Sequence, residues 1–301
     1  MSEKNLQTSD KTQSKFFNLG ATSHVGNIRL SNQDEYGATP TMVAVADGMG
    51  GHNGGEIAAE IAIAVITSAN EFQSNEELAQ LVQKANESIK ARAEENVNLS
   101  GMGTTLCALS QICIKNTSAR IGAVNVGDSR IYIFADNQLH QISIDHSVVQ
   151  NLIDSGQINE IEAKSHPNRN LITRSLGTQE AVEVDSWEIE AITGDRYLLC
   201  TDGLTNELSD SEIAKILQEQ NDPQLAADNL IQAALTNGGS DNVTAVVLDI
   251  VLGEEQTKQR NFHFELQKFL DQRSLKPAQR DRSNKLKMIL NKMKMSKVSE
   301  I

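Results

Sequence analysis

The sequence predicts an α+β domain built as a four-layer α-β-β-α sandwich, with two antiparallel sheets flanked by helix pairs. Two observations lead there. Short β-type segments follow one another directly, and the helical segments come in pairs instead of alternating with single strands. Strictly alternating strands and helices would predict a parallel sheet. The observed order therefore favours two packed antiparallel sheets whose outer faces are covered by helices.

The spacing of apolar residues defines the elements of the first half. Residues 41–46 (TMVAVA) form an apolar run that predicts a buried strand, and helical spacing of Ala, Ile and Leu predicts two helices at 54–70 and 75–96. Asp136-Asn137 supplies a hairpin turn between the last two of the β-type segments that come next. These segments are 104–114, 119–126, 129–135 and 138–144.

The second half begins with an irregular stretch, residues 146–180, which includes a short helix near 147–154. Alternating and apolar runs then resume, and they predict strands and helices in the same grouped order. The strands are expected at 182–190, 196–201 and 243–251, and the helices near 209–219 and 223–236.

Charge divides the chain into an acidic body and a basic tail. Residues 1–250 hold 15 Lys and Arg against 34 Asp and Glu, whereas residues 251–301 hold 12 against 6. The net charge of −13 repels nucleic acid and anionic lipid, so no nucleic-acid partner is expected. We therefore predict a disordered leader (1–15), a folded domain (16–253) and a basic C-terminal tail (254–301).

The cysteines and the N-terminus indicate a reducing compartment. Cys107, Cys113 and Cys200 are odd in number and lack CxxC spacing, which argues against a disulfide framework and a cysteine zinc site. The N-terminus is polar and has no signal-peptide pattern, and no apolar run approaches the length of a membrane span. A cytoplasmic location is the expectation.

Aspartates stand at the ends of the predicted strands. Asp47, Asp128 and Asp202 each follow an apolar run, and Asp241 immediately precedes the last one. Any one of these residues alone fits ordinary turn chemistry. Strand ends of a sandwich converge at one edge, however, and carboxylates gathered there repel one another unless cations bridge them. Oxygen ligands without His or Cys suit Mg²⁺ or Mn²⁺, and a two-ion carboxylate centre suits phosphoryl chemistry.

At these positions the sequence resembles the metal-dependent protein phosphatase (PPM) family, in its bacterial type 2C serine/threonine phosphatase form, over residues 18–251. Seven short motifs carry the resemblance, and they occur in the order that the family shows. They are Arg29-x-x-Asn32-Gln33-Asp34, Asp47-Gly48-Met49-Gly50-Gly51-His52, Gly101-Met102-Gly103-Thr104-Thr105, Asn125-Val126-Gly127-Asp128-Ser129-Arg130, Asp145-His146-Ser147, Thr201-Asp202-Gly203-Leu204 and Gly239-Ser240-Asp241-Asn242.

The resemblance implies a binuclear Mn²⁺ or Mg²⁺ centre. Asp47 would bridge the two ions, and the carbonyl of Gly48 would complete one shell. Asp202 and Asp241 would ligate the first ion, and Asp34 would hold water on the second. A water acidified between two ions serves as the nucleophile in such centres, so no phosphoenzyme is required.

Three further positions follow from the same resemblance. Asp128 matches the position for a third, weaker ion shared with Asp202. Arg29 looks like the phosphate-binding arginine, whose planar fork accepts two phosphate oxygens; the alternative is a surface ion pair. His52 resembles a general acid for the leaving alkoxide, and a structural hydrogen-bonding role is its alternative. Residues 145–180 match the family's flap, a movable element that contacts substrate.

Two other groups of matched residues are assigned structural roles. His146, at the start of the flap, is expected to open that segment structurally because Asp and Ser beside it favour local backbone bonding. Thr104 and Thr105 lie in a glycine-flanked turn and are expected to pack and to form hydrogen bonds.

The basic tail lies outside the family resemblance. Residues 285–297 place four apolar side chains at helical spacing, with lysines on the rest of the helix. Three interpretations remain open: docking on the acidic body, binding a partner as an amphipathic helix, and attachment to an anionic membrane.

The function implied by the resemblance is metal-dependent hydrolysis of phosphoserine and phosphothreonine in proteins, opposing a bacterial Ser/Thr kinase. The alternative is a non-catalytic regulator that binds phosphoproteins or switches partners. Intact Asp47, Asp202 and Asp241 argue against that alternative. A nuclease would want a basic groove, and a haloacid-type phosphatase would need a DxDxT motif where the chain reads DGMGG. The sequence does not name the physiological substrate, the preferred ion or the oligomeric state.

Overall fold

The structure is a computed structural model that describes residues 16–50, 54–69, 71–113 and 120–251. The chain divides at Glu255 into two units, and only the first of them contains described residues. The predicted leader, His52 and the predicted tail lie outside the described residues.

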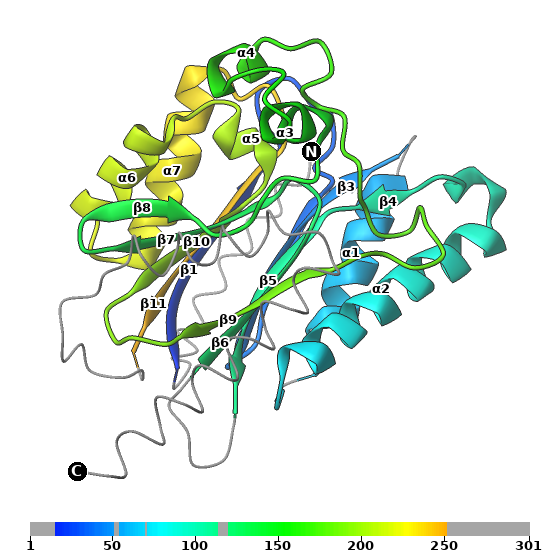
Figure 1. Ribbon diagram of the computed structural model, residues 1–301, viewed down its shortest axis with the longest axis horizontal. Coiled ribbons are helices and arrows are strands. Elements are labelled where there is room, and N and C mark those ends of the chain that lie inside the picture. The colour runs from blue at the N-terminus through cyan, green and yellow to red at the C-terminus, as the bar shows by residue number, and fades with distance from the viewer. Residues whose placement is uncertain (1–15, 51–53, 70, 114–119, 252–301) are drawn as a thin grey trace. The chain divides into compact units, whose positions relative to one another are not determined.

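Two antiparallel sheets form the centre of the described domain (Figure 1). Sheet 1 contains, in spatial order, β1 (Phe17–His24), β11 (Val243–Ile250), β10 (Arg196–Cys200), β7 (Arg130–Ala135) and β8 (Gln138–Gln141). Sheet 2 contains β2 (Asp34–Ala38), β3 (Met42–Met49), β5 (Leu106–Ile112), β6 (Arg120–Val126) and β9 (Asp185–Glu190), with the short β4 (Gly103–Thr104) paired to β3.

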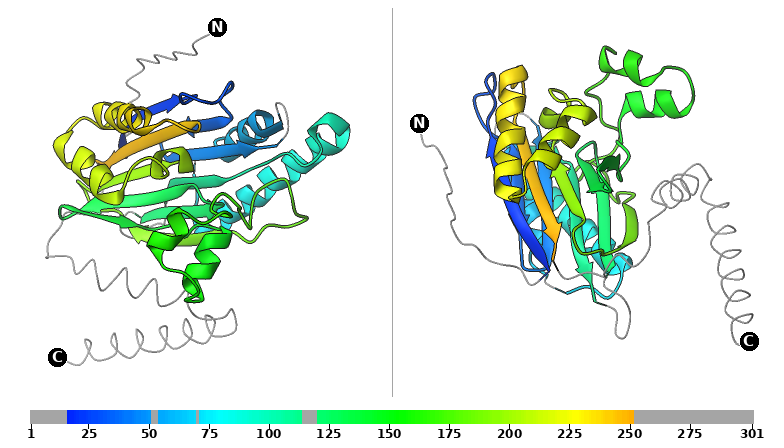
Figure 2. Two further views of the ribbon diagram at one scale, coloured as in Figure 1. Left: turned by 90° about the horizontal axis from the view of Figure 1, so that it is seen from above. Right: turned by 90° about the vertical axis from the view of Figure 1, so that its left-hand side faces the viewer.

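Helices cover the outer faces of both sheets. On sheet 2, α1 (Gly54–Ile66) contacts β2 and β3, and α2 (Asn75–Glu95) contacts β6 and β9. On sheet 1, α7 (Pro223–Asn237) contacts β1 and β11, and α6 (Asp210–Glu219) contacts β8. The views in Figures 1 and 2 show the resulting order of helices, sheet, sheet and helices. The predicted four-layer α+β sandwich is confirmed.

Short helices occupy the connections. A 3-10 turn η1 (Val97–Leu99) follows α2, α3 (Val148–Asp154) and α4 (Glu160–Lys164) lie in the segment between β8 and β9, and α5 (Asp202–Thr205) follows β10. Among the described residues, no helix has the length and apolar character needed to cross a membrane.

Side-chain caps fix where several helices begin. Ser209 accepts a hydrogen bond from the Glu212 N–H and Glu212 reaches back to the Ser209 N–H, which is a capping box at the start of α6. Asp222 caps α7, and Pro223 follows in the first turn, where its missing N–H costs no helical hydrogen bond.

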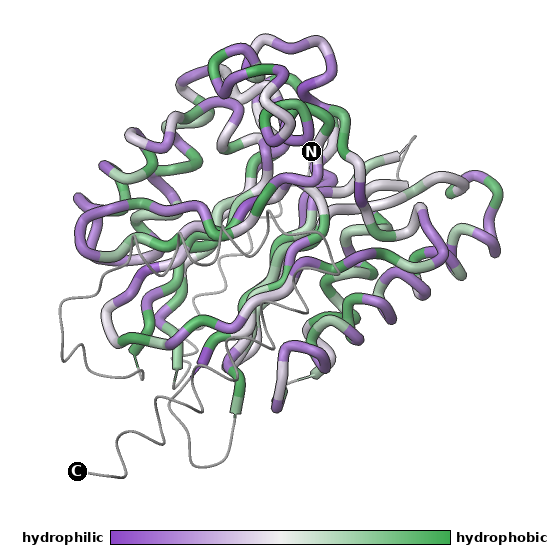
Figure 3. Tube along the Cα trace, viewed as in Figure 1, coloured by the Kyte–Doolittle hydropathy of each residue, from purple (hydrophilic) through white to green (hydrophobic). Residues whose placement is uncertain are grey.

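The core follows the two faces of each strand. Met42, Ala44 and Ala46 of β3 belong to the apolar cluster beneath α1 and α2, and the alternating Val43 and Val45 are equally buried on the face toward sheet 1. A second cluster fills the space between sheet 1 and α5, α6 and α7. In Figure 3, hydrophobic colours follow the strands, whereas the tip of the β7–β8 hairpin and the α4 region are largely hydrophilic.

The predicted turn at Asp136-Asn137 is confirmed by positive φ angles of 51° and 60°, the conformation that a two-residue hairpin needs. Five elements were missed, among them the 3-10 turn η1, and the predicted strand 104–114 is two strands, β4 and β5. β1 and β2 contain glycines and few alternating apolar residues, and α4 and α5 are short enough to lack a helical period.

Candidate metal centre

Asp34 and Asp47 face each other across two strands of sheet 2. Asp34 begins β2, and its direct cross-strand partner in β3 is Asp47. Like charges in directly opposite positions destabilise a sheet. The sheet therefore places two carboxylates together, although their repulsion does not stabilise the pairing of β2 with β3.

The Asp34 carboxylate is buried and only half satisfied. Its Oδ2 accepts hydrogen bonds of 2.8 Å from the hydroxyls of Thr201 and Thr244, which come from the start of α5 and from β11. Its Oδ1 is buried without a hydrogen-bond partner among the described residues. A buried oxygen without a donor is costly, and it is the kind of atom that a bound water or ion satisfies.

The strand end that carries Asp47 is held by a threonine pair. The Asp47 N–H donates to Oγ1 of Thr105, and the Asp47 carbonyl accepts from the Thr105 N–H and from Oγ1 of Thr104, all at 2.9 Å. Both threonines thus pack and form hydrogen bonds, as expected from the sequence. The side chain of Asp47 makes none of these contacts.

Gly48 follows Asp47 and lies against the first turn of α1. A Cβ at Gly48 would stand 2.1 Å from the carbonyl oxygen of Gly55, so only glycine fits. The chain therefore needs glycine on both sides of this contact, where β3 turns into α1. This explains the glycines at positions 48 and 55.

The other three candidate ligands come from sheet-edge connections. Asp128 lies between β6 and β7 and is buried, and Asp202 begins α5, where its Oδ2 accepts from the Asn206 amide at 3.1 Å. Asp241 lies just before β11, and its Oδ1 accepts from the N–H of Asn242. We call these residues together with Asp34 and Asp47 the carboxylate cluster.

Electrostatic coupling shows that the members of the cluster lie close to one another. Burial, followed by the charges of Asp34, Asp202, Asp128 and Asp241, raises the pKa of Asp47 well above its ordinary value. Burial followed by neighbouring carboxylates likewise raises the pKa of Asp128 and Asp202. The expected convergence of strand-end aspartates at one edge is therefore what the structure shows.

Burial also raises the pKa of Asp34, from 3.8 to about 7, although the hydroxyls of Thr201 and Thr244 favour the carboxylate. Two hydroxyl donors are thus too few to offset desolvation and the nearby charges. A positive charge placed in the cluster would restore the ionised forms.

Arg29 is the single basic residue that is ion-paired with the carboxylate cluster in the described part of the chain. Its Nη2 donates to Oδ2 of Asp241 at 2.7 Å, and both side chains are partly exposed. The hydrogen bond to Asp241 raises the pKa of Arg29, as do the charges of Asp241, Asp47 and Asp202. This arrangement is the ion pair that the sequence left open as an alternative to phosphate binding, and it places the guanidinium at the edge of the cluster.

The donor set fits hard divalent ions. The cluster offers carboxylate oxygens, an orphaned oxygen on Asp34 and no His or Cys, which is the chemistry that Mg²⁺ and Mn²⁺ select. As the side chains stand, no three acidic, His or Cys side chains among the described residues surround a single point closely enough to hold an ion. In this arrangement Asp241 is bonded to Arg29 and Asp202 to Asn206.

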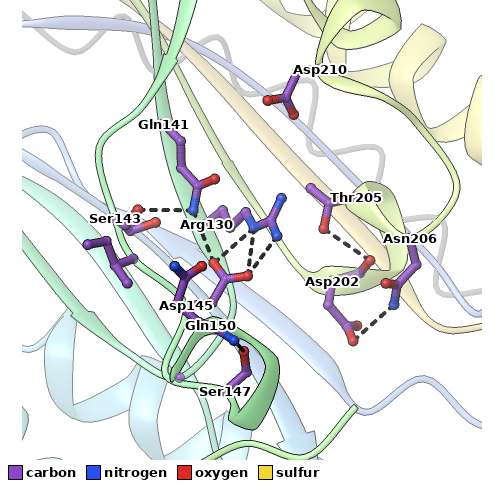
Figure 4. A network of polar contacts seen from close by, with 12 residues as sticks. Arg130, Gln141, Ser143, Asp145, Ser147, Gln150, Asp202, Thr205, Asn206 and Asp210 are labelled. Atoms are coloured by element: carbon purple, nitrogen blue, oxygen red, sulfur yellow. Dashed lines mark hydrogen bonds and ion pairs between the residues drawn. The ribbon is translucent and has the colours of Figure 1, made fainter. Parts of the chain in front are cut away.

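A second polar group beside the cluster satisfies its charges internally (Figure 4). Arg130 binds Asp145 with both Nε and Nη2, at 2.7–3.1 Å, and its Nη1 donates to the hydroxyl of Tyr132. Burial opposes the charged guanidinium, yet Asp145 more than offsets it, and the pKa of Arg130 is raised. Figure 4 shows Asp202 near this pair but turned away from it, toward Asn206.

His146 extends this second group toward β9. Its Nδ1 accepts from the N–H of Gly127, and its Nε2 lies 3.3 Å from Oδ2 of Asp185 and 3.0 Å from Nη1 of Arg174. Arg174 donates to the other oxygen of Asp185 at 3.0 Å. The structure thus gives His146 the structural role expected from the sequence. We call Arg130, Asp145, His146, Arg174 and Asp185 the arginine network.

Comparison with known proteins identifies the family. The profile described as Protein phosphatase 2C matches residues 22–236. The chain belongs to the protein phosphatase 2C family. The matched stretch runs from β1 to α7 and includes four of the five aspartates of the carboxylate cluster, with Asp241 just beyond its end.

Named relatives agree with this membership. The chain is 44% identical over 237 residues to the serine/threonine protein phosphatase PstP of Mycobacterium tuberculosis, an alignment that covers 77% of this chain and 44% of PstP. It is 36% identical over 237 residues to the serine/threonine phosphatase stp of Listeria monocytogenes, covering 74% of this chain and 92% of that protein. The chain thus spans less than half the length of the mycobacterial relative.

Solved structures confirm the fold. The crystal structure of M. tuberculosis PstP/Ppp superposes with a TM-score of 0.73 at 41% identity, covering 79% of this chain and all of that one. The PstP catalytic domain in complex with two manganese ions superposes with a TM-score of 0.69 at 38% identity, covering 79% and 99% of the two chains.

Sequence reasoning missed the residues that hold the candidate ligands. Thr201 and Thr244 grip Asp34, and Asn206 holds Asp202. Thr201 directly precedes Asp202 in a quoted motif, which is a signal that could have found it. Asn206 is four residues beyond Asp202, one helical turn away, and that spacing is a weaker signal.

Proposed function

We propose that this chain hydrolyses phosphoserine and phosphothreonine in proteins, using two Mn²⁺ or Mg²⁺ ions held by the carboxylate cluster. The observation that carries the proposal is a cluster of five aspartates in which burial and mutual repulsion raise the pKa of four members, and in which Arg29 forms the one ion pair among the described residues. Membership of the protein phosphatase 2C family and the manganese found in the related PstP domain support the same chemistry.

The proposed ligand roles are those that the family resemblance implies. Asp47 would contact both ions, the Gly48 carbonyl one of them, and Asp202 and Asp241 the first, while Asp34 would orient water near the second. When bound, such a pair of ions supplies a water acidic enough to act as nucleophile at neutral pH. Asp34 is suited to hold that water because its free Oδ1 can accept a hydrogen bond.

Two further residues complete the proposed machinery. Arg29 would move its planar fork from Asp241 to the phosphate oxygens of the substrate. His52, outside the described residues, would donate a proton to the leaving alkoxide. Asp128 would take part in a third, weaker ion site shared with Asp202; burial, followed by the charge of Asp202, raises the pKa of Asp128, which supports this pairing.

The boundaries, partners and setting are proposals of the same kind. We propose a phosphatase domain over residues 16–253, with a flap at about 145–180, followed by the basic tail (254–301). The substrates would be phosphoproteins of the cytoplasm, including a Ser/Thr kinase and its targets. The three cysteines are unpaired, which is compatible with a reducing compartment.

The test uses a small phosphate ester and a phosphothreonine peptide as substrates for the full chain. Turnover of both with Mn²⁺, and loss of both on adding excess EDTA, supports a metal-dependent phosphatase. A matched Asp47→Ala variant controls for contaminating phosphatases. A chain that binds the phosphopeptide but does not hydrolyse it, with either Mn²⁺ or Mg²⁺ and even at high enzyme concentration, would refute hydrolysis. That result would favour a non-catalytic regulator.

A further inference from the structure

The loop that carries Arg29 is exposed, yet it is tightly held. It connects β1 to β2, and we call residues 25–33 the Arg29 loop. Within the described residues the side chain of Arg29 makes one hydrogen bond, to Asp241. The position of the guanidinium therefore depends on where the backbone of the loop is held.

Asn242 holds both ends of the Arg29 loop. Its Nδ2 donates to the carbonyls of Val25 and Ser31, each at 2.9 Å, and its Oδ1 accepts from the N–H of Gln33 at 2.8 Å. The side chain is buried. All three bonds go to backbone of the same loop, so one amide closes the loop across its base.

Asn27 holds the middle of the Arg29 loop. Its N–H donates to the Gly239 carbonyl at 2.7 Å, and its Nδ2 donates to the carbonyls of Leu235 and Gly238, both at 2.9 Å. These carbonyls lie at or just beyond the C-terminal end of α7, where helical acceptors have no partner within the helix. Asn27 thus joins the loop to the end of a packed helix.

Close backbone packing reinforces this connection. Gly26 has a φ of 79°, and a Cβ there would stand 2.2 Å from the carbonyl oxygen of Asp241. The loop can approach the Asp241 backbone only because Gly26 has no side chain. The Arg29 loop and the Asp241 segment are therefore held together by two asparagines and one glycine contact.

We propose that Asn27 and Asn242 are positioning residues for phosphate binding, which act by holding the Arg29 loop so that the guanidinium stays at the edge of the carboxylate cluster. This inference rests on the proposed function, in which Arg29 binds the phosphate of the substrate. Ordering a nine-residue loop costs conformational entropy. Because the asparagines order it during folding, that cost does not fall on substrate binding.

The test is a double-mutant cycle in the full chain with Mn²⁺. The variants are Asn27→Ala, Arg29→Ala and the double variant, and the readouts are KM for p-nitrophenyl phosphate and the inhibition constant of inorganic phosphate. We expect Asn27→Ala to raise both constants about ten-fold, because a misplaced arginine loses most of its contact with the phosphate. In the Arg29→Ala background, Asn27→Ala should change both constants less than about two-fold, since the residue it positions is absent.

A matched control separates positioning from general stability. Asn96 is a partly exposed asparagine whose side chain also bonds backbone, in the turn after α2. Asn27→Ala and Asn96→Ala should each lower Tm by a few degrees. Asn96→Ala should leave KM and the inhibition constant of phosphate unchanged. Asn242→Ala should raise the same two constants by a larger factor. If this substitution of a buried side chain prevents folding, Asn27→Ala alone still tests the inference.

Two results would overturn the inference. One is that Asn27→Ala raises KM and the inhibition constant by the same factor in the Arg29→Ala background as in the parent. The other is that Asn27→Ala lowers Tm and leaves both constants unchanged. An inactive parent chain would instead refute the proposed function. The inference would then be tested by the rise in Tm that inorganic phosphate causes. This rise should be smaller in Asn27→Ala than in the parent, and it should be the same in Asn96→Ala as in the parent.

Discussion

The carboxylate cluster and the arginine network are neighbouring polar groups that differ in whether their carboxylates have cationic partners. In the arginine network each carboxylate has a cationic partner: Arg130 grips Asp145 with two nitrogens, and Arg174 binds Asp185. In the carboxylate cluster, the described residues give the Asp34 carboxylate only the hydroxyls of Thr201 and Thr244 as donors, and Asp47 is surrounded by other carboxylates. A buried charge left without a partner is costly. The first group therefore has its charges compensated internally, whereas the second has the excess of negative charge that the proposed divalent ions would neutralise.

The first prediction addresses the cluster itself. Asp47→Ala should reduce Mn²⁺-dependent turnover of p-nitrophenyl phosphate at least about a thousand-fold, because it removes the carboxylate placed to contact both ions. Asp47→Asn keeps the size of the side chain and should lose nearly as much, which isolates the charge. Steady-state kinetics at saturating Mn²⁺ measure both. Activity within ten-fold of the parent in either variant would contradict the assignment.

The second prediction addresses the arginine network. Asp145→Asn leaves the guanidinium of Arg130 without its anion, so the free energy of unfolding should fall by about 3 kcal/mol. The affinity for Mn²⁺ should change less than about three-fold, because Asp145 is not a proposed ligand. Urea unfolding and metal titration measure the two quantities. A large loss of metal affinity with unchanged stability would reverse the roles given to the two groups.

The third prediction uses pH. Burial raises the pKa of Asp34 from 3.8 to about 7 in the folded chain. An acid with a raised folded pKa takes up a proton on folding, so its contribution to stability is present below about pH 4 and is lost as the pH rises through 7. Without divalent ions, the Tm of the parent should therefore fall relative to Asp34→Asn, by about 5–10 °C between pH 5 and 8.

The control for this experiment is the same comparison with saturating Mn²⁺. Ions that bind the carboxylates offset the repulsion, so the pH-dependent difference between parent and Asp34→Asn should disappear. A parent whose relative Tm rises with pH in the absence of ions would contradict the raised pKa of Asp34.

The smallest effect is expected from the tail. Every proposed ligand lies at or before Asp241, so truncation after residue 253 should change kcat/KM for a small phosphate ester less than about two-fold. Turnover of a phosphoprotein should respond more, and the response should weaken in high salt, because charge effects are screened over about 8 Å near physiological ionic strength. A folded, truncated chain without activity on the small ester would place part of the tail in the catalytic domain.

The sequence predicts one of the two polar groups much better than the other. Asp47 and Asp202 end apolar runs, so simple strand geometry places their carboxylates at a common edge. Helix pairs and hairpin runs, visible from spacing alone, gave the sandwich. Asp145 and Asp185, in contrast, reach their arginines from separate segments, and no spacing signals such a pairing.

The loops were harder to predict than the layers. Asn27 and Asn242 are separated by more than 200 residues, and their side chains bond backbone groups, which are the same in every residue type. β2 was missed because it starts with Asp34 and contains Gly37, so it lacks the alternation that marks a strand. Sequence patterns therefore predict which faces of helices and strands are buried. They do not predict polar contacts between segments that are distant in the sequence.

The central claim is that the carboxylate cluster is a divalent-ion site, and calorimetric titration of the full chain with Mn²⁺ tests it most directly. The parent should bind two ions, and a third more weakly, with an affinity that increases from pH 6 to 8 as the carboxylates lose their protons. Asp47→Asn should abolish the tight phase, whereas Asp145→Asn should preserve it. Undetectable binding at millimolar Mn²⁺, or a tight phase unchanged in Asp47→Asn, would contradict the claim.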